Sequence, residues 1–273
     1  MRIQRALTPM KGAAGIDPDA QAFYNAVVAA GGTPPPIAVI DRLVRDLKGE
    51  PNIYATANVW GKLVEVKPYC GATAASTAIN LVNTLTYNTS WYNSPSFVLK
   101  GVQFNASTNT YGNAGMNLKV VFPTGNLTIG LWVEYTGGGT YNYDYGCYTS
   151  AKGPLLGNYW LGGSVFGGFR DGGSYYMGPV SSPPTQCFAT WNTDNANPAE
   201  MYINGVFAAS ASAYTDDYSN DFSYDGQLNN LSSSTFNSNQ LHKFKIISAN
   251  LTPSEQPCVY NSINAFLINS GRI

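Results

Sequence analysis

Charge is scarce in this chain of 273 residues. Lys, Arg, Asp and Glu make up 11% of it, against roughly 25% in typical soluble domains. The net charge is −1 and Lys and Arg form no cluster, so the groups that neutralise phosphates are missing and we expect no nucleic-acid partner. No apolar run reaches the roughly 18 residues of a membrane-spanning helix, and the first fifteen residues lack the apolar stretch of a secretory signal.

Histidine and cysteine are also few. The single histidine, His242, stands at the start of a predicted strand, where we interpret it as a surface residue of an edge strand. Any Ser-His-Asp or Cys-His arrangement would depend on it. The cysteines have no C-x-x-C spacing, which argues against a zinc site, and we expect free, buried thiols. They are Cys70, Cys147, Cys187 and Cys258.

The five glutamates are isolated from one another, and Glu134 is the one on the clearest strand pattern. Glycoside hydrolysis needs two carboxylates that flank the scissile bond. Glu134 has Trp132 two positions before it and no carboxylate two or four positions away. We therefore predict that the protein is not an enzyme, and a degenerate glycanase is the third of three hypotheses.

The N-terminal part has helical periodicity. After an extended arm over residues 1–15, Asp17 and Pro18 form a helix start, because Asp caps the first turn and Pro fits its first position. A second helix places apolar residues on one face and charged residues on the other. Its apolar positions are Ile37, Ile40, Leu43, Val44 and Leu47, and its charged positions are Asp41, Arg42, Arg45, Asp46 and Lys48. Together these patterns predict a helical hairpin.

After Pro51 the period changes to that of strands. Residues 127–135 alternate clearly, and Asn204-Gly205 separates two apolar runs, which is the strongest short signal for a β-hairpin. Residues 259–267 return to helical spacing. Many short strands with Gly, Asn and Pro turns indicate a mainly β fold, an antiparallel jelly-roll sandwich with an N-terminal helical hairpin and a C-terminal helix.

Three segments carry a resemblance to a known fold family. They are FNASTNTYG…NLTIGLWVEYTG (104–137), CFATWNTDNANPAEMYINGVFAA (187–209) and HKFKIISANLTPSEQPCVYNSINAF (242–266). Their order is similar to that of the concanavalin A-like, laminin G-type jelly roll. The resemblance covers residues 95–273, and it allows a short helix where residues 59–66 otherwise look like a strand.

A narrower resemblance involves the two ends of the chain. GIDPDAQAFYNA (15–26), VIDRLVRDLKG (39–49) and NAFLINSGRI (264–273) look like segments of tailed-bacteriophage virion proteins in which a helical hairpin precedes a jelly roll. This resemblance implies a structural role on the tail or the capsid surface, as a decoration or head-fibre component. The Pro triplet 34–36 and the Tyr- and Gly-rich middle depart from that pattern.

The predicted organisation has three parts: an arm and helical hairpin over 1–50 for anchoring or oligomerisation, a connecting region over 51–94, and the jelly roll over 95–273. The function predicted from the resemblance is assembly and display of a lectin-like domain in a virion, which would assemble in the host cytoplasm. The partners would be other virion proteins and further copies of this chain in a homo-oligomer. The alternative hypothesis is a carbohydrate-binding module that contacts host glycans.

Aromatic residues are the best candidates for binding. Three tyrosines alternate on one predicted strand, and further rings follow. Such rings beside Asn and Asp suit sugar stacking, and they suit protein interfaces equally well. The candidates are Tyr141, Tyr143, Tyr145, Tyr159, Trp160 and Tyr175.

Residues 221–226 partly match a calcium-binding loop. Asp221 and Asp225 supply carboxylates and Gly226 a turn, but Ser232 stands where the loop needs a bidentate Glu. Asp and Gly also recur in turns for reasons of backbone geometry alone. The sequence therefore predicts no cofactor, with calcium as the only candidate ion.

Overall fold

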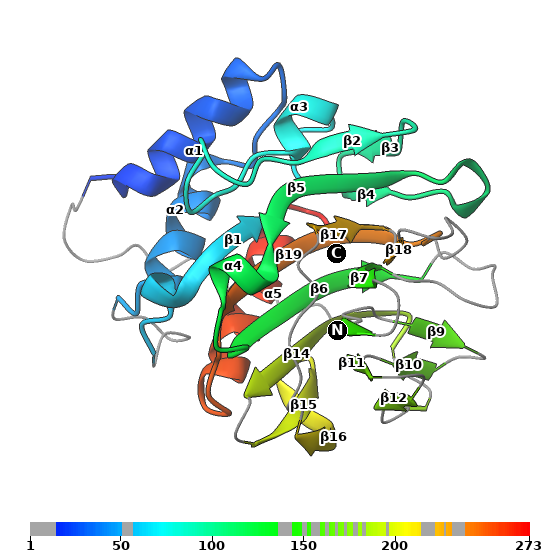
Figure 1. Ribbon diagram of the computed structural model, residues 1–273. Coiled ribbons are helices and arrows are strands. Elements are labelled where there is room, and N and C mark those ends of the chain that lie inside the picture. The colour runs from blue at the N-terminus through cyan, green and yellow to red at the C-terminus, as the bar shows by residue number, and fades with distance from the viewer. Residues whose placement is uncertain are drawn as a thin grey trace.

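The computed structural model describes residues 15–50, 57–135, 144–148, 152–153, 159–161, 164–166, 169–171, 174–176, 180–181, 184–194, 197–213, 222–226, 228–230 and 238–273. In this part of the chain, helices and antiparallel sheets stack in layers (Figure 1). None of the described helices is long and apolar enough to cross a membrane.

In the described part of the chain, three helices of more than two turns lie toward its two ends. They are α1 (Pro18–Ala29), α2 (Ile37–Leu47) and α5 (Glu255–Asn269). Four shorter helical turns also occur in the described ranges: η1 (Trp60–Lys62), α3 (Ala74–Thr77), η2 (Ala106–Thr108) and α4 (Leu118–Val121).

An eight-stranded antiparallel sheet forms the centre of the molecule. Its order is β16-β15-β14-β6-β19-β4-β3, and β1 pairs with β19 beside this path. The strands are β1 (Leu63–Lys67), β3 (Ser96–Val98), β4 (Gly101–Gln103), β6 (Leu127–Glu134), β14 (Gln186–Asp194), β15 (Asn197–Ile203), β16 (Val206–Ala213) and β19 (Leu241–Ala249).

A five-stranded sheet in the order β18-β7-β17-β5-β2 packs against it. These strands are β2 (Ser90–Tyr92), β5 (Tyr111–Asn117), β7 (Tyr145–Tyr148), β17 (Phe222–Asp225) and β18 (Leu228–Asn230). Only the β18–β7 pair among them is parallel. Two three-stranded sheets hold β8 (Lys152–Gly153), β9 (Tyr159–Leu161), β10 (Ser164–Phe166), β11 (Phe169–Asp171), β12 (Ser174–Tyr176) and β13 (Val180–Ser181).

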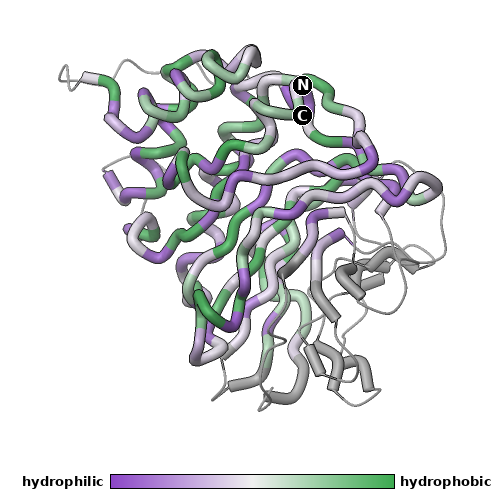
Figure 2. Tube along the Cα trace, turned by 45° about the horizontal axis from the view of Figure 1, so that its top comes forward, coloured by the Kyte–Doolittle hydropathy of each residue, from purple (hydrophilic) through white to green (hydrophobic). Residues whose placement is uncertain are grey.

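Both faces of the eight-stranded sheet are covered. On one face, Trp132, Phe188 and Phe244 share a core with the helical hairpin and α5. On the other face, Leu131 and Met201 belong to a second core that includes residues of β5, α4 and β7. Figure 2 shows hydrophobic residues along both the helices and the strands of the described part of the chain. The mainly β, antiparallel fold with helices at both ends, as predicted, is confirmed.

The start of α1 follows the predicted capping chemistry. The Asp17 carboxylate accepts a hydrogen bond from the backbone N–H of Asp19 at 2.9 Å, and Pro18 occupies the first helical position. The charged face predicted for α2 is less exposed than expected. Asp41 and Asp46 are 7% and 2% exposed, because each pairs with an Arg four residues away on the same helix.

The Asn204-Gly205 turn joins β15 and β16 as predicted. Both residues have positive φ, 53° and 78°, which is the backbone conformation that a type I′ turn requires. The Asn204 side chain also accepts a hydrogen bond from the N–H of Phe188 at 2.9 Å. The turn therefore closes the hairpin and fastens it to β14.

Candidate functional site

The predicted aromatic candidates lie in different parts of the molecule. Tyr141 and Tyr143 fall outside the described residues. Tyr145 lies on β7 with 1% of its surface exposed, turned into the space between the two large sheets. Tyr159 and Trp160 lie on β9, and Tyr175 lies on β12.

Only one of the two predicted calcium ligands lies in the described part of the chain. Asp221 falls outside the described residues. Asp225 ends β17 and is 1% exposed, and its Oδ1 lies 2.6 Å from the Lys245 Nζ. An ammonium group therefore occupies the position at which a cation would meet this carboxylate. Among the described residues, no group of three or more His, Cys, Asp and Glu could hold a metal ion.

His242 is buried, so the prediction of a surface edge histidine is wrong. Its strand, β19, lies between β6 and β4 inside the sheet, and the side chain has no exposed surface. His242 Nε2 lies 3.0 Å from Asp144 Oδ1, and the Ser238 hydroxyl donates to the same oxygen. Because the carboxylate lies between the imidazole and the hydroxyl, the imidazole is not placed to act as the base for Ser238.

Glu134 has no carboxylate partner in the described part of the chain. Its Oε2 lies 2.5 Å from the Lys243 Nζ, and its side chain is 35% exposed. Lys243 also donates to the amide oxygen of Gln186 at 2.9 Å. The arrangement is an ion pair between two central strands, at the C-terminal end of β6, without the second acid of a glycosidase.

A row of three stacked tyrosines on the five-stranded sheet is the surface best suited to binding. The rings of Tyr92 and Tyr111 stack with centroids 4.6 Å apart and planes 6° apart. The Tyr111 and Tyr224 rings stack at 4.7 Å and 26°. The three residues come from β2, β5 and β17, and we call them the tyrosine stack.

Strand alternation explains why these rings reach the surface. Tyr92 is 42% exposed, whereas its neighbour Trp91 turns to the other face and packs against Phe104 and Tyr69. Likewise Asp225, next to Tyr224, points into the space between the sheets. The stack therefore stands on the outer face of the five-stranded sheet, with a buried ionic group directly beneath it.

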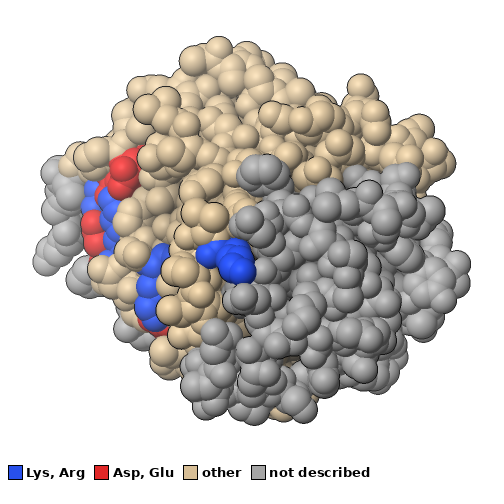
Figure 3. Space-filling view, in the orientation of Figure 1, with Lys and Arg blue, Asp and Glu red and all other residues tan. Residues whose placement is uncertain are grey.

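The surroundings of the tyrosine stack are almost uncharged. Residues 68–99 and 101–118 contain no Lys, Arg, Asp, Glu or His, and Asn113 lies beside Tyr224 and Ser90 in the sheet register. Charged side chains in Figure 3 gather mainly on the side of the helical hairpin. Burial, and then the neighbouring Tyr92, raise the pKa of Tyr111, so its hydroxyl stays neutral and able both to donate and to accept hydrogen bonds.

Sequence reasoning missed this stack. Tyr92, Tyr111 and Tyr224 lie far apart along the chain, and only strand pairing aligns them. The long uncharged stretch around the first two was visible in the sequence and was the one available signal.

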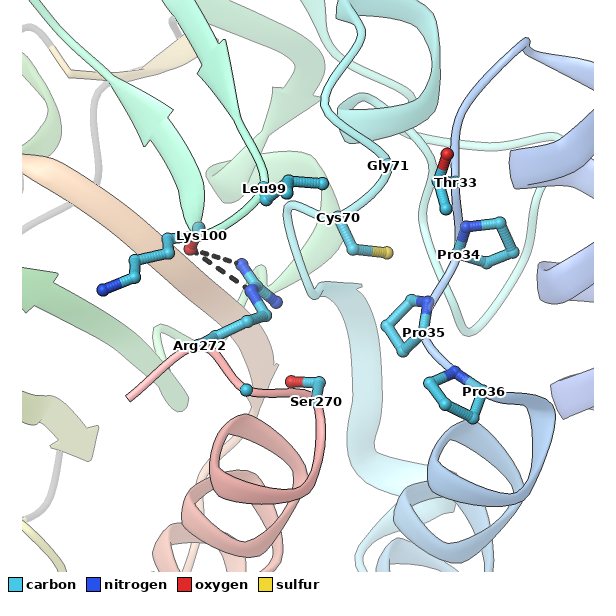
Figure 4. Close-up of a pocket in the computed structure, with 11 residues that line it drawn as sticks. Thr33, Pro34, Pro35, Pro36, Cys70, Gly71, Leu99, Lys100, Ser270 and Arg272 are labelled. Atoms are coloured by element: carbon cyan, nitrogen blue, oxygen red, sulfur yellow. Dashed lines mark hydrogen bonds between the residues drawn. The ribbon is translucent and has the colours of Figure 1, made fainter.

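A groove of about 240 Å³ lies at the junction between the helical hairpin and the C-terminal end of α5. Figure 4 shows the rings of Pro34, Pro35 and Pro36 on one side and Arg272 on the other. The Arg272 guanidinium is buried, and it donates to backbone carbonyls of four residues. They are Pro68, Tyr69, Lys100 and Lys243. These N–H donors of Arg272 are therefore bonded within the protein, and they hold the C-terminal end of the chain against three other segments.

Three cysteines in the described residues form no disulfide bond: Cys70 and Cys187, which are buried, and Cys258, which is partly exposed. Burial raises the pKa of Cys70 to about 11 and that of Cys187 to about 12. Both thiols therefore stay protonated near neutral pH and are poor nucleophiles.

Comparison with known proteins places the chain by fold alone. No family model matches the sequence, and no curated protein matches it. Solved structures similar to it include a receptor-binding domain, at 11% identity, TM-score 0.55 and 78% coverage of this chain. The binding domain of botulinum neurotoxin serotype D, at 12% identity, has a TM-score of 0.54 and covers 75% of this chain.

A third similar structure is that of botulinum neurotoxin type C, a protein that needs two ganglioside molecules to enter cells. It is 11% identical, with a TM-score of 0.54 and 76% coverage of this chain. The chain matches about half the length of these structures, 52–53%. The similarity shows that the chain shares a β-rich fold with these structures.

Proposed function

We propose that this chain is a non-catalytic binding domain that recognises neutral carbohydrate through the tyrosine stack. The observation that carries the proposal is the row of three rings, one of them 42% exposed, on a sheet face whose first two strands lie in an uncharged stretch of the chain. Phenol hydroxyls, together with nearby Asn and Ser groups, match the hydroxyl-rich edge of a sugar, and aromatic carbon covers its apolar face. Two of the similar solved structures are binding domains, which supports the same class of function.

A glycan array tests this proposal. The intact chain is expected to bind one or more neutral glycans, and Tyr92→Ala and Tyr111→Ala are each expected to weaken binding by about fivefold, since one aromatic contact contributes on the order of 1 kcal/mol. Tyr135→Ala is the matched control, because Tyr135 is similarly exposed, 39%, but stands at the end of β6. Absence of glycan binding, or equal losses in all three variants, would contradict the proposal.

We further propose that the domain is displayed on a virion, where it contacts other virion proteins or further copies of itself. The supporting observation is that the three virion-like segments lie together, since α2 packs against both α1 and α5. Deleting residues 1–50 would remove the helices that cover this core, so a surface substitution is the better test. Val28, 49% exposed on α1, is a suitable site. Val28→Asp is expected to reduce incorporation into particles without changing the melting temperature.

A further inference from the structure

The space between the two large sheets contains a closed group of ionised side chains. Glu65 and Lys67 come from β1, Lys245 from β19 and Asp225 from β17. Their side chains are between 0% and 1% exposed. Charged groups are rarely buried so completely unless they are paired, and here two acids face two lysines.

The contacts within this group are short. The Lys245 Nζ lies 2.6 Å from Asp225 Oδ1 and 2.9 Å from Glu65 Oε1. The same Glu65 oxygen lies 2.5 Å from the Lys67 Nζ. Thus Glu65 bridges the two amines, and Lys245 lies between the two carboxylates.

Aromatic rings enclose the group. The Lys245 Nζ lies 5.0 Å from the centre of the Tyr145 ring, and the buried Tyr69 belongs to the same space. Burial and the neighbouring Asp225 and Glu65 carboxylates raise the pKa of Tyr69 well above its usual value, so its phenol stays neutral. Compared with water, such a buried medium lowers the cost of converting the ion pair into a neutral amine and a neutral acid.

We propose that Lys245 and Asp225 condense after folding to form an amide cross-link between β19 and β17, with Glu65 as the proton carrier. The bond would join the eight-stranded sheet covalently to the five-stranded sheet. It would also remove two buried charges and leave Glu65 paired with Lys67, so the interior remains balanced.

The condensation needs no oxidant and no cofactor. A proton moves from the Lys245 ammonium to Asp225 across their 2.6 Å contact, which gives a neutral amine and a neutral acid. The amine lone pair attacks the Asp225 Cγ, Glu65 takes a second proton from the nitrogen and delivers it to the leaving hydroxyl, and water departs. One C–N bond forms and one C–O bond breaks.

The reaction would proceed slowly, once per molecule. Burial alone would lower the pKa of Lys245, but Asp225 and Glu65 outweigh burial and hold this pKa above its ordinary value. The ion pair is therefore the predominant form of Lys245 and Asp225, and the neutral amine with the neutral acid is a minor form.

The intact mass of the full chain under denaturing conditions tests the proposal. Loss of one water lowers the mass by about 18 Da relative to the sequence, and a digest should yield one branched peptide that contains both Asp225 and Lys245. An intact mass equal to that of the sequence, after prolonged incubation of the folded protein, would overturn the proposal whatever the variants do.

A matched variant separates the cross-link from another route to the same mass. Asp225 precedes Gly226, and an Asp-Gly pair can also lose water by closing on its own backbone. Lys245→Arg keeps the positive charge but removes the amine nucleophile, so its mass should equal its sequence. If Lys245→Arg still loses about 18 Da, the cross-link is excluded.

Two further variants address the proton carrier. Glu65→Gln should abolish or greatly slow the mass change. Lys62→Arg, at a half-exposed lysine near the opposite end of β1, should leave it intact. An unchanged rate in Glu65→Gln would remove Glu65 from the proposed step.

Discussion

The two faces of the eight-stranded sheet are stabilised by different interactions. Along β19, Phe244 and Ile246 face the helices and belong to an apolar core, whereas Lys245 and His242 face the five-stranded sheet and meet carboxylates. Apolar burial is non-directional and grows with area, at roughly 25 cal/mol per Å². Each buried charge needs an oppositely charged partner in a fixed position. The face toward the five-stranded sheet therefore restricts the positions of its side chains more strictly than the face toward the helices does.

This difference bears on strand register. A slip of β19 by one residue would turn Lys245 toward the helices and Phe244 toward Asp225, because side chains alternate along a strand. The apolar face would tolerate several partners for Phe244, but the ionic face would leave charges unpaired on both sides. The ionic interior therefore makes wrong strand pairings unfavourable, whereas the apolar residues of the strands alone would allow several pairings.

The largest effect is expected from breaking the ionic interior. Lys67→Met leaves a carboxylate in excess in a fully buried space, and such a change typically costs about 3–5 kcal/mol. Lys62→Met removes the partner of Glu255 on the helix side, where the lysine is 33% exposed, and should cost less than about 1 kcal/mol. Urea unfolding of the two variants measures the contrast, and equal losses would mean that the ionic interior adds nothing beyond a surface pair.

A smaller effect is expected from an apolar change on the helix face. Phe244 packs edge-on against Phe266 with centroids 5.7 Å apart. Phe244→Leu keeps the site apolar and is expected to cost about 1–1.5 kcal/mol. If Phe244→Leu lowered the free energy of unfolding as much as Lys67→Met in the same urea experiment, apolar packing on the helix face would be as sensitive to substitution as charge pairing on the other face.

The helix face was largely predictable from the sequence, and the ionic face was not. Periodic apolar residues predicted α1, α2 and α5, and Asn204-Gly205 predicted its hairpin, because these features depend on neighbours in the chain. Glu65, Asp225 and Lys245 are far apart in sequence, and strand order alone brings them together. Lysines within an apolar strand, Lys243 and Lys245 beside Phe244, were the one local sign that β19 has a buried polar side.

The candidate site shows the same limit. The prediction for Tyr145 identified a residue of the sandwich interior, and the predictions for Tyr141 and Tyr143 lie outside the described residues. The tyrosine stack depends on the register of β2, β5 and β17, which no local sequence pattern predicts. The scarcity of charge around Tyr92 and Tyr111 is visible in the sequence, and the proposed carbohydrate surface draws on it.

The smallest effect concerns the one strongly shifted carboxylate of the helical layer. Burial raises the pKa of Asp46 to about 6, although Arg42 at 2.6 Å opposes the shift. A raised folded-state pKa means that the folded protein binds this proton more tightly than the unfolded chain, so the associated stability is present at low pH and is lost as pH rises through about 6. Between pH 5 and pH 7 the wild type should lose on the order of 1 kcal/mol that Asp46→Asn does not lose. Urea unfolding of both proteins at the two pH values measures this difference. Parallel pH dependences would show that Asp46 is charged throughout, and that the helical layer, like the ionic interior, holds its carboxylates as ion pairs.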